Sequence, residues 1–286
     1  MRSEFRCRFK GLSLFLTLLL APLLAPSSVA GGEPVLQDAS VSPAIQMLSA
    51  TAAVQTLSAA SASPATPAIP KIATQPSLTP FKAYYQAQFD LGVSVSGEAF
   101  RELKALPDGQ WQLSMTASTL MAKIEESSRF EIRHQQLRPL EYRYKRKVFM
   151  NKKQRRQLFD WSKGTLASTY KDQTRLLQIS QPTYDNISYQ LQLWRDLKAG
   201  LTEMSYSLAD GDHLKTLQFD RAGEEFIDTP AGRFETIRVK RDRGEDSART
   251  TRIWFAKDLE NVIVKLEQIE TDGKEYVLLL EHLETP

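Results

Sequence analysis

The sequence predicts an all-β fold: an antiparallel meander curled into a barrel or half-barrel, with one helix packed on it. Two observations predict this fold class. Apolar and polar residues alternate along most of residues 81–286, so each run has one apolar face, as half-buried strands do. Turn-forming residues separate these runs at short intervals, which favours roughly a dozen strands joined by tight hairpins.

The strands are clearest where the alternation is uninterrupted. The last strand, 277–280, is apolar on both faces, so we expect it in the middle of the sheet. Asp-Gly and Pro-containing turns supply the backbone angles that tight hairpins need. The predicted strands include 85–91, 111–117, 130–134, 262–266 and 276–280, and the predicted turns are 107–109, 210–211, 230–232 and 272–273.

One segment, about 185–199, follows a helical period instead. Asp185 can cap the helix and Gly200 can end it. A single helix in a β-meander is expected to cover an open barrel end or the concave face of the sheet. Trp194 then either packs in the core without a ligand role or lines a ligand cavity. The apolar stripe of the helix is Ile187, Leu191, Trp194 and Leu197.

The N-terminal residues predict export. A basic start precedes an apolar run at 12–25, and small residues at 28–30 predict a signal peptide cleaved after Ala30. We therefore expect a periplasmic protein without a transmembrane span after cleavage. Residues 31–80 are rich in Ala, Ser, Pro and Thr and contain no aromatic residue, which predicts a disordered tether. A single β-rich domain is expected over 81–286.

Charge and cysteine content exclude several classes of protein. The chain has 37 Lys and Arg and 34 Asp and Glu. The predicted signal removes four cations and one acid, so the mature net charge is 0 and does not indicate a nucleic-acid partner. The only cysteine, Cys7, precedes the apolar run, so the mature chain has no thiol. Disulfides, thiolate zinc sites, a cysteine nucleophile and a lipoprotein cysteine are all excluded.

The strongest local signal is a cationic segment, with no acid between Glu141 and Asp160. It is either a solvated strand face or a surface that binds anions such as lipid headgroups, lipopolysaccharide phosphates or an acidic polymer. A further alternative is pairing with residues 257–286, whose net charge is −5. The candidate ligand-binding residues here are Arg143, Lys145, Lys147 and Lys153. All eight cations are Arg143, Lys145, Arg146, Lys147, Lys152, Lys153, Arg155 and Arg156.

No residue pattern indicates catalysis, a metal or a cofactor. The chain lacks the nucleophile elbow, the zinc-protease motif, the phosphate loop and the dinucleotide-binding glycines. His134 falls on the apolar face of its predicted strand, so we expect it in the core or lumen. Asp210, Asp212 and His213 are interpreted as a turn rather than a cation site.

Several short motifs occur together in order. Phe89-Asp90-Leu91-Gly92 is followed by Gly97-Glu98-Ala99, Leu137-Arg138-Pro139, Asp185-Asn186-Ile187-Ser188, and the segments 228–234 and 253–258. This set resembles the DUF3108 family of exported Gram-negative bacterial proteins, which has no assigned activity. The resemblance implies an envelope location and a curved antiparallel sheet.

These observations predict a non-enzymatic periplasmic β-module that binds an apolar or anionic amphipathic envelope component. The expected partner is lipid, lipopolysaccharide or an envelope protein, and export argues against nucleic acid. The alternative is a structural or protein-interaction partner in envelope assembly, and a glycan-acting enzyme is a third, less favoured option. A roomy apolar cavity would favour a ligand carrier, whereas a filled interior with exposed apolar residues would favour a partner protein.

Overall fold

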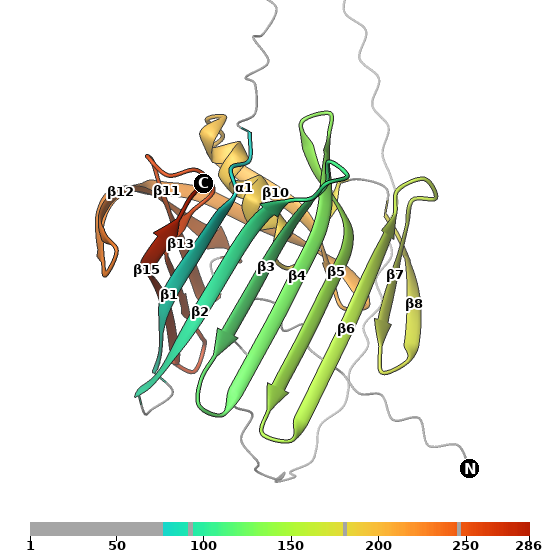
Figure 1. Cartoon of the computed structure of the whole chain (residues 1–286), viewed down its shortest axis with the longest axis horizontal. Coiled ribbons are helices and arrows are strands. Elements are labelled where there is room, and N and C mark those ends of the chain that lie inside the picture. Colours follow the sequence, from blue (N-terminus) through green and yellow to red (C-terminus); the bar gives the residue numbers. More distant parts are fainter. Residues whose placement is uncertain (1–76, 91–93, 180–181, 245–246) are drawn as a thin grey trace, which may run out of the picture. The chain divides into compact units, whose positions relative to one another are not determined.

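The computed structural model describes residues 77–90, 94–179, 182–244 and 247–286 (Figure 1). The predicted signal peptide, its cleavage after Ala30 and the predicted tether up to residue 76 lie outside the described residues. Packing begins with Leu78, which is buried, and Thr79, whose carbonyl oxygen accepts a hydrogen bond from Asn261 Nδ2 at 3.2 Å. The described chain is therefore anchored to the domain a few residues before the first strand.

The described residues form fifteen strands and one helix. The first eight strands are β1 (Phe81–Asp90), β2 (Ser94–Ala105), β3 (Trp111–Ser118), β4 (Ala122–Arg133), β5 (Gln136–Val148), β6 (Asn151–Asp160), β7 (Thr165–Tyr170) and β8 (Gln173–Gln178). The other elements are β9 (Thr183–Tyr184), α1 (Ser188–Lys198), β10 (Glu203–Asp210), β11 (His213–Thr229), β12 (Gly232–Asp242), β13 (Thr250–Ala256), β14 (Ile263–Ile269) and β15 (Glu275–Glu284).

All fifteen strands belong to one sheet, in the order β8 to β1, then β15 to β9. Neighbours are antiparallel except β9 and β10, which are parallel. This confirms a largely antiparallel sheet with one helix, and β15 lies in its middle as predicted. The backbone ladder is open: β8 and β9, consecutive along the chain, form its two edges and are not paired with each other.

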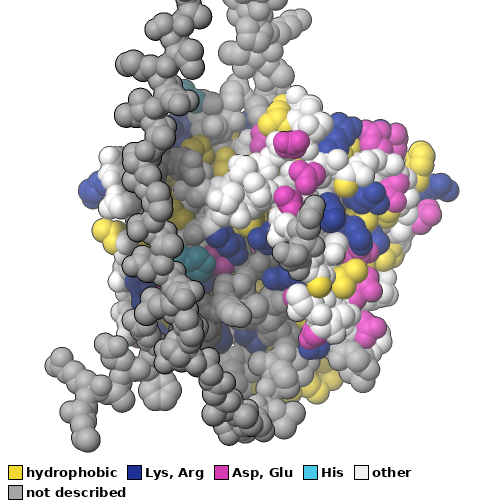
Figure 2. Space-filling model, turned by 180° about the vertical axis from the view of Figure 1, so that it is seen from behind, with side chains coloured by type: hydrophobic (Ala, Val, Ile, Leu, Met, Phe, Trp, Pro, Cys, Tyr) yellow, Lys and Arg dark blue, Asp and Glu magenta, His cyan; other side chains and the backbone are white. Residues whose placement is uncertain are grey.

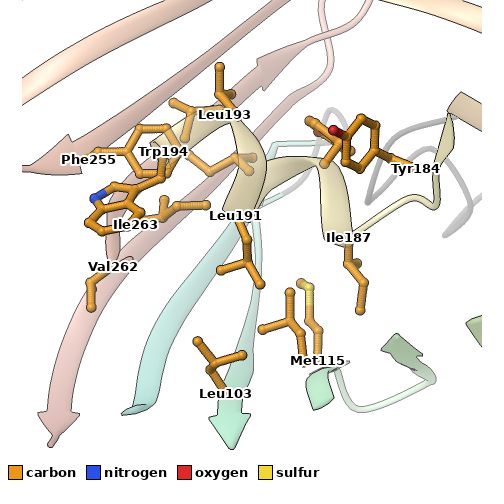
Figure 3. Close-up of a cluster of buried hydrophobic side chains, with 14 of the residues drawn as sticks. Leu103, Met115, Tyr184, Ile187, Leu191, Leu193, Trp194, Phe255, Val262 and Ile263 are labelled. Atoms are coloured by element: carbon orange, nitrogen blue, oxygen red, sulfur yellow. The ribbon is translucent and has the colours of Figure 1, made fainter. Parts of the chain in front are cut away.

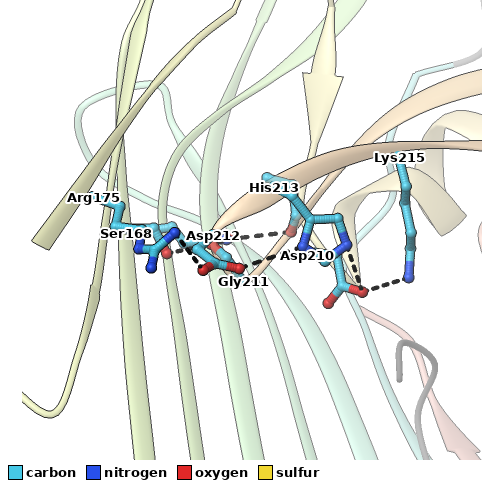
Figure 4. Close-up of polar contacts among 9 residues, drawn as sticks. Ser168, Arg175, Asp210, Gly211, Asp212, His213 and Lys215 are labelled. Carbon is cyan, nitrogen blue, oxygen red and sulfur yellow. Dashed lines mark hydrogen bonds and ion pairs between the residues drawn. The ribbon is translucent and has the colours of Figure 1, made fainter. Parts of the chain in front are cut away.

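Side chains connect strands from opposite ends of this ladder (Figure 4). The turn between β10 and β11 lies against β6, β7 and β8. The carbonyl oxygen of Gly211 accepts hydrogen bonds from Ser168 Oγ and, at 3.3 Å, from Gln157 Nε2. Arg175 on β8 forms a 3.1 Å ion pair with Asp212. The two ends of the sheet are therefore joined through side chains and not through backbone pairing.

Both predicted helix boundaries are confirmed. Asp185 Oδ1 accepts hydrogen bonds from the backbone N–H groups of Ile187, at 3.0 Å, and Ser188, at 2.9 Å. Ser188 Oγ in turn accepts from the N–H of Asp185 at 3.0 Å, so the first turn is capped reciprocally. At the other end Gly200 has φ +90°, the left-handed conformation that ends helices and favours glycine.

Helix α1 is enclosed, not laid on a surface (Figure 3). Every residue from 188 to 197 is buried, the polar ones included. Its apolar stripe enters the core, where Trp194 lies among Phe255, Val262 and Ile263. Its polar side chains have partners: Gln192 Oε1 accepts from the N–H of Leu137 at 3.2 Å. We call the sheet face that contacts α1 the inner face and the opposite one the outer face.

The position of His134 corrects the sequence prediction. His134 was expected in the core or lumen, but it is exposed, and β4 ends before it at Arg133. His134 and Gln135 form the two-residue turn to β5, with φ values of 49° and 66°. Positive φ at both turn positions matches the right-handed twist of the flanking strands. Without a glycine or asparagine, the sequence gave no sign of this turn.

Candidate functional site

The cationic segment forms one hairpin, β5 and β6, which we call the basic hairpin. Its two-residue turn is Phe149-Met150, between the paired residues Val148 and Asn151. Because directly paired residues share a sheet face, the register assigns each cation to a face. The outer face carries Arg143, Lys145, Lys147, Lys152 and Arg156, and the inner face carries Arg146, Lys153 and Arg155.

The predicted site residues are thus only partly brought together. Arg143, Lys145 and Lys147 share the outer face, whereas Lys153 lies on the inner face opposite Arg146. Trp194 belongs to the core and is 1% exposed. The structure therefore groups the hairpin cations and places Trp194 in a different environment.

Glu141 neutralises the part of the hairpin far from its turn. Its Oε1 is 2.8 Å from Arg143 Nε and 2.6 Å from Arg156 Nε. Burial raises the pKa of Glu141, but the hydrogen bonds from both arginines outweigh this and hold the pKa below its ordinary value. Lys145, Lys147 and Lys153 take part in no ion pair among the described residues. The positive charge is therefore uncompensated near the turn.

The acidic C-terminal stretch does not pair with this hairpin. Glu267 contacts Lys265 at 3.1 Å and also Arg252, and Glu270 contacts Arg249 at 3.0 Å. Strands β4, β3, β2 and β1 separate β5 from β15 in the sheet. Figure 2 shows cations and carboxylates interspersed on the right of the view, over the half of the sheet that contains β11 to β15. The alternative of structural pairing with residues 257–286 therefore has no support in the described contacts.

Exposed apolar side chains lie at the end of the basic hairpin. The turn between β3 and β4 is its direct neighbour, because the N–H of Phe149 donates to the carbonyl oxygen of Met121 at 3.1 Å. Both turns lie at the lower edge of the sheet in Figure 1. Four of the nine exposed large apolar residues in the described chain lie here. They form the apolar tip: Leu120, 94% exposed, Met121, 56%, Phe149, 62%, and Met150, 92%.

Sequence reasoning named Phe149 only as an aromatic residue between cations and did not find this tip. A signal was present. A two-residue hairpin turn normally contains Gly, Asn or Asp, and this one contains Phe-Met. The partnership with the β3–β4 turn could not be read from the sequence, because it depends on strand register.

The interior is filled. One cavity among the described residues encloses about 10 Å³, is lined by Tyr85, Arg101, Met115 and Gln190 among others, and has room for about one water molecule. A second, beside Phe89, encloses about 0 Å³. Trp194 lines neither cavity. The structure therefore shows no space for an enclosed lipid at either place.

A buried polar cluster lies between α1 and the inner face. Ser128 Oγ donates to Asp185 Oδ2 at 2.6 Å, and Asn186 Nδ2 donates to the Tyr142 hydroxyl at 3.1 Å. Glu126, 7% exposed, is next to Tyr142, and burial raises the pKa of Glu126 to about 8. These groups come from β4, β5 and the start of α1, so the cluster fastens the helix to the sheet.

The described residues contain no group of three or more His, Cys, Asp and Glu arranged to hold a metal ion. Asp210-Gly211-Asp212 is a hairpin turn, as predicted, with Gly211 at φ +72°. Asp210 pairs with Lys215 at 2.7 Å, and Asp212 with Arg175. Among the residues that the structure describes, no helix combines the length and apolar composition needed to cross a bilayer.

These features define a class: a β-sheet domain filled by its own helix, with a cationic hairpin at one end. A family model described as "Protein of unknown function (DUF3108)" matches residues 81–281, and the chain belongs to this family. The resemblance carried by the sequence motifs is thereby confirmed. None of the curated proteins matches the chain.

Solved structures agree on the fold. The chain is similar to a "Beta-barrel-like Protein of Domain of Unknown Function DUF1849" from Brucella abortus, with TM-score 0.51 and 10% identity over 73% of this chain and 98% of that chain. A "putative lipoprotein" from Parabacteroides distasonis matches with TM-score 0.28 and 15% identity, covering 74% of this chain and 98% of that one. A "putative exported protein with YmcC-like fold" from Bacteroides fragilis matches with TM-score 0.28 and 9% identity, covering 74% and 99%.

Proposed function

We propose that the domain is a non-enzymatic, exported module that binds an anionic amphipathic component of the cell envelope through the basic hairpin. In this proposal the sheet is a half-barrel scaffold, α1 fills its interior, and binding takes place outside. The basic start, the apolar run and the small residues at 28–30 support export to the periplasm.

The observation that carries the proposal is the uncompensated charge near the hairpin turn. Lys145, Lys147 and Lys153 are exposed and have no ion-pair partner among the described residues. Cations on a structural surface are usually interspersed with acids, as they are over β11 to β15. A local positive field on a mature chain expected to be neutral overall favours a negatively charged partner.

The filled interior supports external binding over an enclosed ligand. Ligand pockets begin at about 300 Å³, whereas the cavity beside Tyr85 encloses about 10 Å³. Binding inside would require displacement of α1, whose residues 188–197 are all buried. Loss of so much buried apolar surface would cost far more than a surface contact.

The test is sedimentation with vesicles that contain phosphatidylglycerol, at low and moderate salt. Each cation near an anionic membrane adds roughly 1 kcal/mol. Replacement of Lys145, Lys147 and Lys153 by Gln should therefore weaken binding about 100-fold at low salt, and less at higher salt because ions screen the attraction. Arg143 is left in place because it pairs with the largely buried Glu141.

A matched control removes the same charge elsewhere. Lys104 and Lys163 lie toward the opposite ends of β2 and β6, and Lys240 is exposed on β12. Their replacement by Gln should leave vesicle binding nearly unchanged. Equal binding by the two triple variants would contradict the proposal and leave the basic hairpin as a solvated surface. Circular dichroism checks that both variants are folded.

Protein interaction in envelope assembly is the second candidate. The observation that favours it is Phe226, which is 58% exposed on the β11–β12 hairpin, away from the basic hairpin in the strand order. A Phe226→Ser variant that loses a co-purifying envelope protein, while vesicle binding is absent in the parent, would favour this candidate.

A further inference from the structure

We propose that the apolar tip enters the hydrocarbon layer of an anionic lipid bilayer, so that the basic hairpin stands end-on to the membrane. This inference rests on the proposed function and adds its partner and its orientation. The lysines and Arg146 would lie at the level of the lipid headgroups, and Leu120, Phe149 and Met150 below them.

The first argument is exposure without an internal reason. Leu120 and Met150 are more than nine-tenths exposed, at 94% and 92%. Exposed apolar residues are common singly, but a cluster marks an interaction site. Here two adjacent turns, tied by the hydrogen bond from Phe149 to Met121, present four such residues at one point.

The second argument is the conformation of Phe149. Its φ is +50°, in the left-handed region, which costs a residue with a Cβ about 1–2 kcal/mol and which glycine adopts freely. No burial compensates this strain, because the side chain is 62% exposed. Glycine at this position would serve folding better. A local conflict without a structural gain is expected where a residue has a function.

The third argument is the distribution of charge around the tip. Lys145, Lys147 and Lys152 lie on the outer face of the hairpin, and Arg146 and Lys153 lie on the inner face. A sheet that docked flat would need its cations on one face. Cations on both faces, with apolar residues at the end between them, fit an approach along the strand direction.

Shape and charge together favour a lipid surface over a protein partner. The tip consists of two narrow turns and not of a flat area near the 1,000 Å² that a specific protein interface requires. Long lysine side chains beside apolar residues are suited to the boundary between headgroups and hydrocarbon. On the outer face near the tip, Glu125 is paired with Lys123 at 2.7 Å, and Glu98 on β2 is exposed. The lysines therefore still leave an excess of positive charge.

A labelling experiment tests insertion directly. The only cysteine is Cys7, so a Cys7→Ser background allows a single label. The exported protein carrying Met150→Cys, coupled to the fluorophore NBD, should show a blue shift with phosphatidylglycerol vesicles and quenching by lipids brominated in their acyl chains. The control is Lys163→Cys in the β6–β7 turn, at the other end of β6, which should show neither effect.

A variant series separates this inference from the proposed function. The tip variant combines Leu120→Ser, Phe149→Gly and Met150→Ser. It should weaken vesicle binding at moderate salt at least about tenfold, which corresponds to about 1.4 kcal/mol, and it should keep the salt-sensitive attraction of the lysines. Its thermal stability should be unchanged or higher, because Phe149→Gly removes the strained backbone. The matched control replaces three other exposed apolar residues, Leu176, Leu201 and Phe226, by Ser.

Each outcome distinguishes the two statements. Parent-like binding by the tip variant, with no blue shift at Met150→Cys, would overturn insertion and leave anion binding intact. Equal affinity for soluble polyphosphate and for vesicles would likewise overturn insertion and point to a free polyanion. No difference between the lysine variant and its charge-matched control would overturn the proposed function itself. Weakening by the control apolar variant as large as that by the tip variant would contradict the assignment of insertion to this tip.

Discussion

Glu126 is the residue whose chemistry depends most on the fold. Burial raises the pKa of its carboxyl group to about 8, the charge of Asp185 raises it further, and Tyr142 and Arg101 act in the opposite direction. The folded domain thus holds Glu126 protonated at neutral pH. An unfolded chain would ionise the same group near pH 4.5.

Stability should therefore fall as pH rises across this window. Below pH 4.5 both states are protonated and the group has no effect. Between pH 4.5 and about 8 the unfolded state binds one proton fewer, so the free energy of unfolding falls by up to about 1.4 kcal/mol per pH unit. Above about pH 8 both states are ionised, and the destabilisation stays constant.

Glu126→Gln tests this mechanism. The amide cannot ionise, so the variant should be more stable than the parent at pH 8 and nearly equal to it at pH 4. Urea unfolding at a series of pH values gives the difference. A difference that does not change with pH would mean that Glu126 is ionised in the folded domain.

At the scale of elements, α1 decides what the interior can do. Trp194 is 1% exposed and lies among Phe255, Val262 and Ile263, and Lys198 Nζ lies 6.0 Å from its ring centroid. Trp194→Ala should destabilise the domain by about 3–5 kcal/mol, because buried aromatic truncations leave a cavity. Trp194→Phe should cost less. Guanidinium unfolding measures both, and vesicle binding measured beside it should not change.

The opposite result would change the assignment of α1. A cost below about 1 kcal/mol, together with altered lipid binding, would mean that α1 leaves the inner face and that Trp194 contacts a ligand. The helix would then be a displaceable plug, and the carrier hypothesis would replace surface binding.

The same element shows how far sequence reasoning reaches. Asp185, the four-three-three spacing of the apolar stripe and Gly200 predicted α1 because these signals are local. Burial of its polar side was not predictable, because Gln192 and Asp196 are satisfied by distant groups, the N–H of Leu137 and the hydroxyl of Tyr206. Local pattern gives an element and its apolar face, whereas partners across the sheet depend on tertiary contacts.

Turns show the same limit on a smaller scale. Turns that contain Asp-Gly or Pro were predicted, and the structure has them. The turns at 134–135, 149–150 and 171–172 contain no glycine, and their positive φ angles appear only in the structure. The basic hairpin was visible as a run of cations, but its division between two faces and its junction with the β3–β4 turn required the strand register.

At the scale of the whole domain, the first and last strands meet in the middle of the sheet. β15 pairs with β1 on one side and β14 on the other, so it joins the half that ends at β8 to the half that ends at β9. Helix α1 contacts both β5 and β10, and the turn at Gly211 hydrogen-bonds to Ser168. Two halves connected at three places should not unfold separately.

Leu280→Ala tests this cooperativity. Leu280 is fully buried and pairs with Tyr85 at the β1–β15 junction, so its truncation should cost about 2–5 kcal/mol. If the domain unfolds as one unit, the most protected amides of β4 and of β13 should lose the same free energy of opening in hydrogen exchange. Leu176→Ala, at an exposed position on β8, should change neither. Loss of protection in β13 with β4 unaffected would show that the two halves are independent. The basic hairpin and its apolar tip would then act on a scaffold that does not need β9 to β15.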